Sequence, residues 1–150
     1  MAYTLQAFIG DQSKLEQKAA SGLPFVPLPQ GKALIPLTDD IRDNHGIPFL
    51  PLTDEGKEEI PASIESLADQ FKGAIAYVEA EFFGGDGIQA SAVWKEGKLI
   101  FGPLVDVSAI NEALRRLGVT KGNHHDEFDS LGLGTYRDTN QWGSKSSRTS

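Results

Sequence analysis

Apolar and polar residues alternate in the middle of the chain as they do in strands that have one covered face. Residues 74–83 form the longest β-prone run, and a Gly-rich turn at 84–87 separates it from a second alternating run at 88–94. Another tight turn leads to a third apolar run at 98–101. We therefore predict an antiparallel meander centred on 74–101, which forms the backbone of the fold.

Apolar residues recur at helical spacing in three other segments. The stripe over 61–72 predicts one helix, because its apolar positions are three and four residues apart. A similar stripe predicts a helix over 109–117, with Ser108 as its N-cap and Gly118 directly after its last turn. A shorter helix is expected over 12–20, close to the N-terminus.

A proline-rich region with a repeated local pattern precedes the meander. Residues 25–28, 34–37 and 49–52 each consist of two apolar residues followed by Pro-Leu. Because proline cannot donate to a sheet ladder, these pieces are predicted to be edge strands, strand ends or extended connectors. Thr38 and Thr53 are expected to be helix N-caps, since carboxylates follow each of them.

These elements define the fold class. The alternation of residues 3–9 predicts one more strand. The 150 residues are a common size for one domain. We therefore expect a single α+β domain over 1–142, with an antiparallel sheet and helices packed on one face of it. The Ser-rich segment 143–150 is expected to be a flexible C-terminal tail.

The absence of cysteine limits the chemistry of the chain. With no Cys, disulfides, thiolate nucleophiles and Cys-ligated metal centres are excluded. We see no apolar leader at the N-terminus and no run as long as a membrane span. The expected location is therefore the cytoplasm, with no membrane contact. No cofactor is expected, because no phosphate-binding or nucleophile motif is present.

The net charge of −7 bears on the partner. A polyanion such as DNA or RNA is repelled by this field, and the one basic cluster, 145–148, lies in the expected tail. We therefore expect no nucleic-acid partner. An acidic chain is better suited to solubility, or to contact with a basic protein.

Carboxylates are concentrated in the segment 38–59. Seven of them stand against Arg42 and Lys57, which gives a local charge of −5. Mixed with apolar residues, this segment predicts an acidic surface that speeds encounter with a basic partner, and the alternative is a solvated face with helix-terminal carboxylates. The residues expected to bind a partner are Asp39, Asp40, Asp43, Asp54 and Glu55.

Possible metal ligands are densest in the segment 124–129. His124, His125 and Asp126 carry imidazole and carboxylate groups of the kind that bind zinc, manganese or iron. The segment lacks the H-E-x-x-H spacing that places two histidines on one helix face, and it lacks the pattern of an EF-hand loop. A metal site is therefore one hypothesis, and a solvated or helix-capping segment is the other.

Glu79 and Glu81 form a second candidate group. Strand side chains alternate between the two faces, so these two carboxylates are expected on the same face of the strand over 74–83. Paired carboxylates divide acid and base roles when their surroundings separate their pKa values. The alternative is that both residues serve solubility on an exposed strand.

Four stretches between roughly residues 33 and 142 carry a resemblance to known proteins. They are Ile35-Pro36-Leu37-Thr38-Asp39, Tyr77-Val78-Glu79-Ala80-Glu81-Phe82-Phe83-Gly84-Gly85 through Val93-Trp94 to Gly102-Pro103-Leu104, Ile110-Asn111-Glu112-Ala113-Leu114-Arg115-Arg116-Leu117-Gly118-Val119, and Asp126-Glu127-Phe128-Asp129-Ser130-Leu131-Gly132-Leu133-Gly134. With these stretches the chain resembles a group of small acidic bacterial proteins of unknown function, and this resemblance implies no catalytic residues. The small acidic format is also similar to that of immunity proteins, which block a toxin by direct binding.

The sequence thus favours a non-enzymatic protein-binding domain, of the immunity type, that neutralises a partner through its acidic surface. This expectation rests on the charge of 38–59 and on the absence of a catalytic motif. A metal-dependent or small-molecule enzyme that uses the segment 124–129 is one alternative. The other is a structural accessory protein that forms a homo-dimer or larger homo-oligomer when the outer strand of the meander pairs with its copy.

Overall fold

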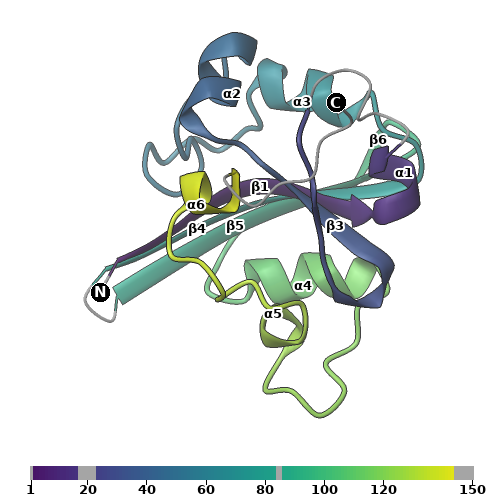
Figure 1. Cartoon of the computed structure of the whole chain (residues 1–150). Coiled ribbons are helices and arrows are strands. Elements are labelled where there is room, and N and C mark those ends of the chain that lie inside the picture. The colour runs from purple at the N-terminus through teal and green to yellow at the C-terminus, as the bar shows by residue number, and fades with distance from the viewer. Residues whose placement is uncertain (1, 17–22, 84–85, 144–150) are drawn as a thin grey trace.

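Six strands form one antiparallel sheet in the computed structural model, which describes residues 2–16, 23–83 and 86–143 (Figure 1). Their order across the sheet is β2-β3-β1-β4-β5-β6, so β1 and β4 lie at the centre. Helices are packed above and below this sheet. The strands are β1 (Tyr3–Asp11), β2 (Val26–Pro27), β3 (Lys32–Pro36), β4 (Ala74–Phe83), β5 (Asp86–Lys95) and β6 (Lys98–Val105).

The predicted meander is confirmed as β4, β5 and β6, each antiparallel to the next. β4 has the predicted bounds, whereas β6 continues to Val105 instead of ending at residue 101. Residues 84–85 of the expected turn lie outside the described residues, and β5 already begins at Asp86. The predicted N-terminal strand is also confirmed, and β1 inserts between β3 and β4, which makes it a central strand.

The helices are shorter than their apolar stripes suggest. α3 ends at Ala68 instead of residue 72, because the chain then turns and Phe71 packs against Phe8 with 6.0 Å between ring centroids. The prediction over 12–20 is met by α1 up to Glu16, and residues 17–20 lie outside the described residues. The helices are α1 (Gln12–Glu16), α2 (Asp39–His45), α3 (Ala62–Ala68), α4 (Ala109–Arg116), α5 (Glu127–Ser130) and α6 (Thr139–Gly143), with a 3-10 turn at Pro29–Gly31.

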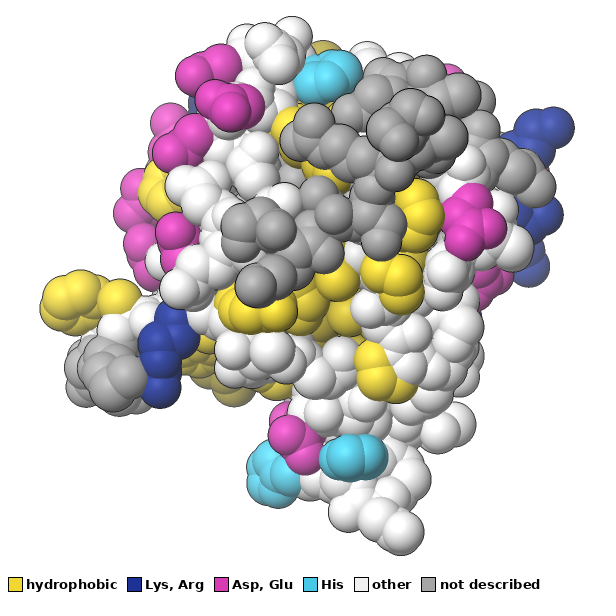
Figure 2. All heavy atoms as spheres, in the orientation of Figure 1, with side chains coloured by type: hydrophobic (Ala, Val, Ile, Leu, Met, Phe, Trp, Pro, Cys, Tyr) yellow, Lys and Arg dark blue, Asp and Glu magenta, His cyan; other side chains and the backbone are white. Residues whose placement is uncertain are grey.

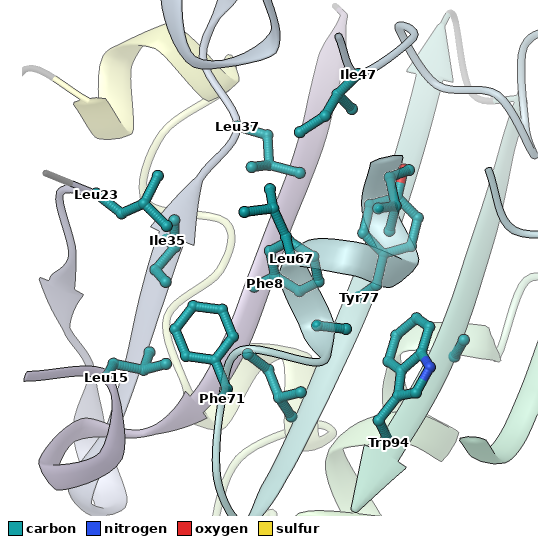
Figure 3. Close-up of a cluster of buried hydrophobic side chains, with 14 of the residues drawn as sticks. Phe8, Leu15, Leu23, Ile35, Leu37, Ile47, Leu67, Phe71, Tyr77 and Trp94 are labelled. Carbon is teal, nitrogen blue, oxygen red and sulfur yellow. The ribbon is translucent and has the colours of Figure 1, made fainter. Parts of the chain in front are cut away.

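The α+β class and the single antiparallel sheet are confirmed, but helices cover both faces of the sheet instead of one. The side chain of Tyr77 faces a core cluster that includes Leu67 of α3. Its strand neighbour Val78 faces a second cluster, which includes Leu114 of α4. Figure 3 shows the first cluster, in which Leu67 and Phe71 point toward the aromatic rings of β1 and β4. The sheet is therefore the middle layer of three.

Of the three predicted N-caps, Thr38 is confirmed, Thr53 is wrong, and Ser108 occupies the N-cap position of α4 without the expected side-chain bond. Thr38 caps α2 as expected, since its hydroxyl accepts a hydrogen bond from the Ile41 amide at 3.4 Å. Thr53 lies within a turn instead of before a helix, and its hydroxyl donates to Glu79 at 2.9 Å. Ser108 makes no capping bond to α4, because its hydroxyl donates to Asp106 at 2.5 Å.

The segment 132–142 packs on the core. The hydroxyl of Tyr3 donates to the Leu133 carbonyl at 2.7 Å, and the hydroxyl of Thr139 donates to the Thr4 carbonyl at 3.2 Å. Trp142 is buried in the second cluster, and this segment therefore belongs to the domain. The expected tail begins one residue too early, since Gly143 is the last residue of α6, and 144–150 lie outside the described residues.

None of the helices in the described part of the chain combines the length and the apolar character that a membrane crossing requires.

Candidate functional site

The seven carboxylates of the segment 38–59 are all exposed, and we call the surface that they form the acidic face. Figure 2 shows acidic side chains gathered at the upper left of the molecule, over α2 and the loop that follows it. Such a concentration of carboxylates makes the local electrostatic potential more negative. The acidic face comprises Asp39, Asp40, Asp43, Asp54, Glu55, Glu58 and Glu59.

α2 is placed so that its carboxylates point to solvent. The helix buries only Ile41, and Gly46 ends it with the left-handed backbone conformation that glycine adopts without strain, at φ 66°. Asp39 and Asp40 stand in the first turn, where the helix dipole stabilises negative charge. Asn140 of α6 fixes the first of them, because its amide donates to the Asp39 carboxylate at 3.1 Å.

An exposed aromatic ring borders these carboxylates. Phe49 is 44% exposed, and the guanidinium of Arg42 lies 4.8 Å from the centre of its ring. The same guanidinium forms an ion pair with Asp39. The positive charge of Arg42 is therefore paired with Asp39 and with the ring of Phe49. The exposed ring lies on a surface whose carboxylates outnumber its cations.

The segment that carries Phe49 is held from below by Gln6 of β1. The Gln6 amide nitrogen donates to the Pro48 carbonyl at 3.0 Å, and its amide oxygen accepts from the Leu50 amide at 3.3 Å. Leu50 has a φ of 42°, a left-handed conformation that a leucine keeps only when its surroundings enforce it. The bonds from Gln6 on both sides of Phe49 supply that constraint.

Glu79 of β4 fixes the next part of the same segment. This side chain is fully buried, and its carboxylate accepts hydrogen bonds from the amides of Leu52 at 3.2 Å and Thr53 at 2.8 Å. The hydroxyl of Tyr77 donates to it at 2.5 Å, and the amide nitrogen of Gln6 donates to that hydroxyl oxygen at 2.9 Å. One connected network of buried polar groups thus anchors the backbone from residue 48 to residue 53.

Burial shifts the pKa values of both ionisable groups in this network. Desolvation raises the pKa of Glu79 above its usual value of 4.5, against the effect of the hydrogen bonds from Tyr77, Thr53 and Leu52. Desolvation and the neighbouring Glu79 carboxylate raise the pKa of Tyr77 well above 10. Burial therefore disfavours the charged form of both groups.

Glu79 and Glu81 do not form a catalytic pair in this fold. Glu79 is closed to solvent beneath Leu52 and Thr53, so a substrate has no route to its carboxylate. Glu81 is half-buried, and its pKa is raised first by desolvation and then by the charge of Asp54. The expectation that both residues lie on an exposed strand is wrong for Glu79, because β4 is central.

The histidine segment lies at the other end of the molecule, in the loop before α5 and on it (Figures 1 and 2). The ring of His124 lies 3.4 Å from the Asp129 carboxylate, and His125 is exposed. The Asp126 carboxylate caps α5 by accepting from the Asp129 amide at 2.8 Å. Among the described residues, no group of three or more such side chains is arranged to hold a metal ion. Metal binding by His124, His125 and Asp126 stays a prediction.

Gln6 is the residue of this site that the sequence interpretation missed. It lies in β1 between the buried residues Leu5 and Ala7, and its own side chain is also fully buried. A polar residue within such a run indicates a buried hydrogen-bond partner, because an unpaired amide in the core is costly. That signal indicates that Gln6 has a hydrogen-bond partner but does not identify it, since Pro48 and Tyr77 are far away in the sequence.

No known protein family, no curated protein sequence and no solved structure matches this chain.

Proposed function

We propose that this protein is a non-enzymatic protein-binding domain that contacts a basic partner through its acidic face. The observation that carries the proposal is the exposure of seven carboxylates beside Phe49, on a backbone held in place by Gln6 and Glu79. Charge complementarity steers a basic partner toward this face. An aromatic side chain that is already held in place loses little conformational freedom on binding, which favours affinity.

The kind of binding that fits best is inhibition by direct contact, as immunity-type proteins perform it. A partner that acts on nucleic acid presents a basic surface, and a rigid acidic face covers such a surface by complementarity. The absence of cysteine supports a cytoplasmic setting, where such a partner is met. This proposal needs no catalytic group in the chain, because occlusion alone blocks the partner.

Reversing charges on the acidic face should slow association with the partner. We expect Asp40→Lys with Asp54→Lys to lower the association rate constant at least about tenfold at low ionic strength. The difference should shrink at about 0.5 M salt, because screening removes long-range attraction. The partner is first captured on the tagged protein from a lysate of the native host and identified by mass spectrometry, and the rates are then measured by surface plasmon resonance.

A matched variant separates the position of the charges from their number. Glu16→Lys with Asp129→Lys changes the net charge by the same amount, and both residues are exposed outside the acidic face. Equal slowing by the two double variants would show that net charge, not the acidic face, steers the partner. If the wild-type protein retains no stoichiometric protein, the proposed function is wrong. Retention that EDTA abolishes would instead favour the metal-dependent alternative.

Removing the ring of Phe49 should weaken the complex without unfolding the domain. We expect Phe49→Ala to raise the dissociation constant at least about tenfold, because aromatic side chains are typical hot spots of interfaces. Phe83→Ala is the control, since Phe83 is also exposed, at 76%, on the β4 strand outside the acidic face. Calorimetric titration of the captured partner measures both variants. An unchanged dissociation constant for Phe49→Ala excludes the ring from the interface.

A further inference from the structure

The outer strand β6 has an open edge. It is the last strand of the sheet and pairs with β5, and no described residue pairs with its other side. Leu99, Ile100 and Val105 of this strand are exposed large apolar residues. Unpaired backbone groups beside apolar side chains form a template for the addition of another extended chain.

A groove runs along this edge on the α3 side of the sheet. It consists of three adjoining pockets of about 520, 650 and 450 Å³, of which the first and the third are lined in part by β6 and the second lies between the loop 57–61 and α3. Ala62 and Glu65 line both the first and the second pocket, and Lys57 and Glu58 line both the second and the third. One wall is therefore continuous from the loop that follows Leu52 to α3.

The two sides of the groove differ in chemistry. The sheet side is mainly apolar, with Leu99 in the first pocket and Val105 in the third, and it also carries Lys98. The opposite wall carries carboxylates that outnumber the cations, and four acidic residues stand against Lys57 and Lys98 in the whole groove. These acidic residues are Glu58, Glu59, Glu65 and Asp69.

We propose that this groove binds an extended segment of a partner protein, with alternating cationic and apolar side chains, as an added strand on β6. Successive side chains of a strand added to β6 point to opposite faces of the sheet, so the cationic set lies on the α3 face, toward the carboxylate wall, and the apolar set lies on the other face. The eight residues of β6 span about 26 Å, enough for about eight residues of peptide. The inference rests on the proposed protein-binding function and identifies the chemistry of the bound segment.

A second copy of this chain fits the groove less well. Two-fold pairing of β6 with itself brings two acid-lined walls together, on molecules that each carry a net charge of −7. Pro103 has no amide hydrogen to donate, and the pairing of β5 with β6 is shifted near Val93. A two-fold pairing contains Pro103 in both strands, whereas a peptide on β6 loses at most the one hydrogen bond that Pro103 cannot donate.

The test uses a fluorescein-labelled peptide of about eight alternating lysine and valine residues. We expect saturable binding below about 1 mM by fluorescence anisotropy, and added hydrogen-exchange protection at the amides of β6. The same peptide methylated on alternate backbone nitrogens keeps its charges but loses the strand bonds, so it should bind at least about tenfold more weakly. Equal binding of the methylated peptide, or protection confined to α2, would overturn the proposal.

Val105→Arg should weaken peptide binding at least about tenfold, because it adds a bulky cation to the apolar side of the groove. The matched control is Val107→Arg, two residues further on, since Val107 is exposed and lies outside the three pockets. The control should change binding less than about twofold. Equal effects of the two variants would show that net charge, not the groove, determines binding.

Two further results separate this inference from the proposed function. If the captured partner is sensitive to Asp40→Lys with Asp54→Lys but not to Val105→Arg, the groove proposal fails and the protein-binding function stands. If the labelled peptide binds in the groove while no partner depends on the acidic face, the proposed role of that face fails instead. Sedimentation that shows a dimer dissociated by Val105→Arg would replace the peptide with a second copy.

Discussion

Replacing Glu79 with alanine is expected to lower the free energy of unfolding by about 3 kcal/mol or more. The substitution removes the acceptor for the amides of Leu52 and Thr53 and for the hydroxyl of Tyr77, all in the buried network. Donors that lose their partner inside the protein lose the hydrogen bond and do not regain water. Urea denaturation followed by tryptophan fluorescence measures the change.

The expected effect is local as well as global. Hydrogen exchange at the amides of Leu52 and Thr53 should become faster in Glu79→Ala than expected from the lower global stability alone. The strained Leu50 should then relax, and Phe49 should lose its fixed place on the acidic face. Association with the partner should weaken for this reason, even though Glu79 itself is buried and touches nothing outside the domain.

Two comparison variants keep this prediction testable if the alanine variant does not fold. Glu79→Gln retains an oxygen for the backbone amides and a nitrogen that can donate to Tyr77, so it should lower stability by only about 1 kcal/mol. Glu81→Ala, two residues along the same strand, should change stability by less than about 0.5 kcal/mol. A loss in Glu81→Ala as large as that in Glu79→Ala would contradict the anchoring role of Glu79.

The glutamine variant also serves as the reference for the pH dependence of stability, because glutamine does not titrate. The pKa of Glu79 is raised in the folded state, so its contribution is fully present below its usual pKa and is lost as the pH rises through the raised value. The stability of the wild type relative to Glu79→Gln should therefore decrease over the pH interval that begins at the usual pKa of 4.5 and ends above the raised pKa. An increase over that interval would mean that the hydrogen bonds to the carboxylate outweigh its desolvation.

The meander was predictable because its information is local. Residues 74–101 alternate with a period of two and are divided by glycine turns, and each strand pairs with the next along the chain. The stripe of α4 was equally clear, since Ile110, Ala113, Leu114 and Leu117 share one face at a spacing of three and four. Neither pattern needs knowledge of distant residues.

The position of β1 was not predictable in the same way. Its partners, β3 and β4, begin 29 and 71 residues after Tyr3, and local alternation does not determine which strands a strand joins. That position decides the rest of the site. It brings Gln6 beside Tyr77, and it makes β4 a buried central strand, so that Glu79 became an anchor where the alternation alone suggested surface charge.

The acidic face was visible because it is continuous in the sequence, whereas the groove along β6 was not. Lys57, Glu65 and Val105 meet there from a loop, a helix and a strand. Pairing of the outer strand with a copy of itself was one alternative that the sequence left open, whereas the carboxylate wall depends on α3, which the fold places beside the sheet edge. Composition thus indicated the sign of the partner's charge, and topology supplied a second surface of the same sign, which shares Glu58 and Glu59 with the acidic face.

Gly102→Ala is expected to lower the free energy of unfolding by about 3 kcal/mol, the second large effect. Gly102 has a φ of 83°, which an alanine adopts only with strain. An added Cβ would also meet the Ser91 carbonyl oxygen at 2.5 Å and the Leu104 amide nitrogen at 3.0 Å. Both are backbone atoms, so no side chain can rotate away and the two strands must separate locally.

Gly118→Ala isolates the steric part of this effect. Gly118 has nearly the same φ, 85°, but no atom lies within 4 Å of the position that its Cβ would take. Gly118→Ala should therefore lower the free energy of unfolding by only about 1 kcal/mol, which is the cost of the backbone conformation alone. Thermal and urea unfolding of both variants give the difference.

Equal losses of stability in the two variants would show that β5 and β6 move apart without cost at Ser91. Val105 would then not be held rigidly in the groove. A larger loss in Gly102→Ala, together with weaker binding of the lysine–valine peptide, would tie the close approach of the two strands to the shape of the open edge.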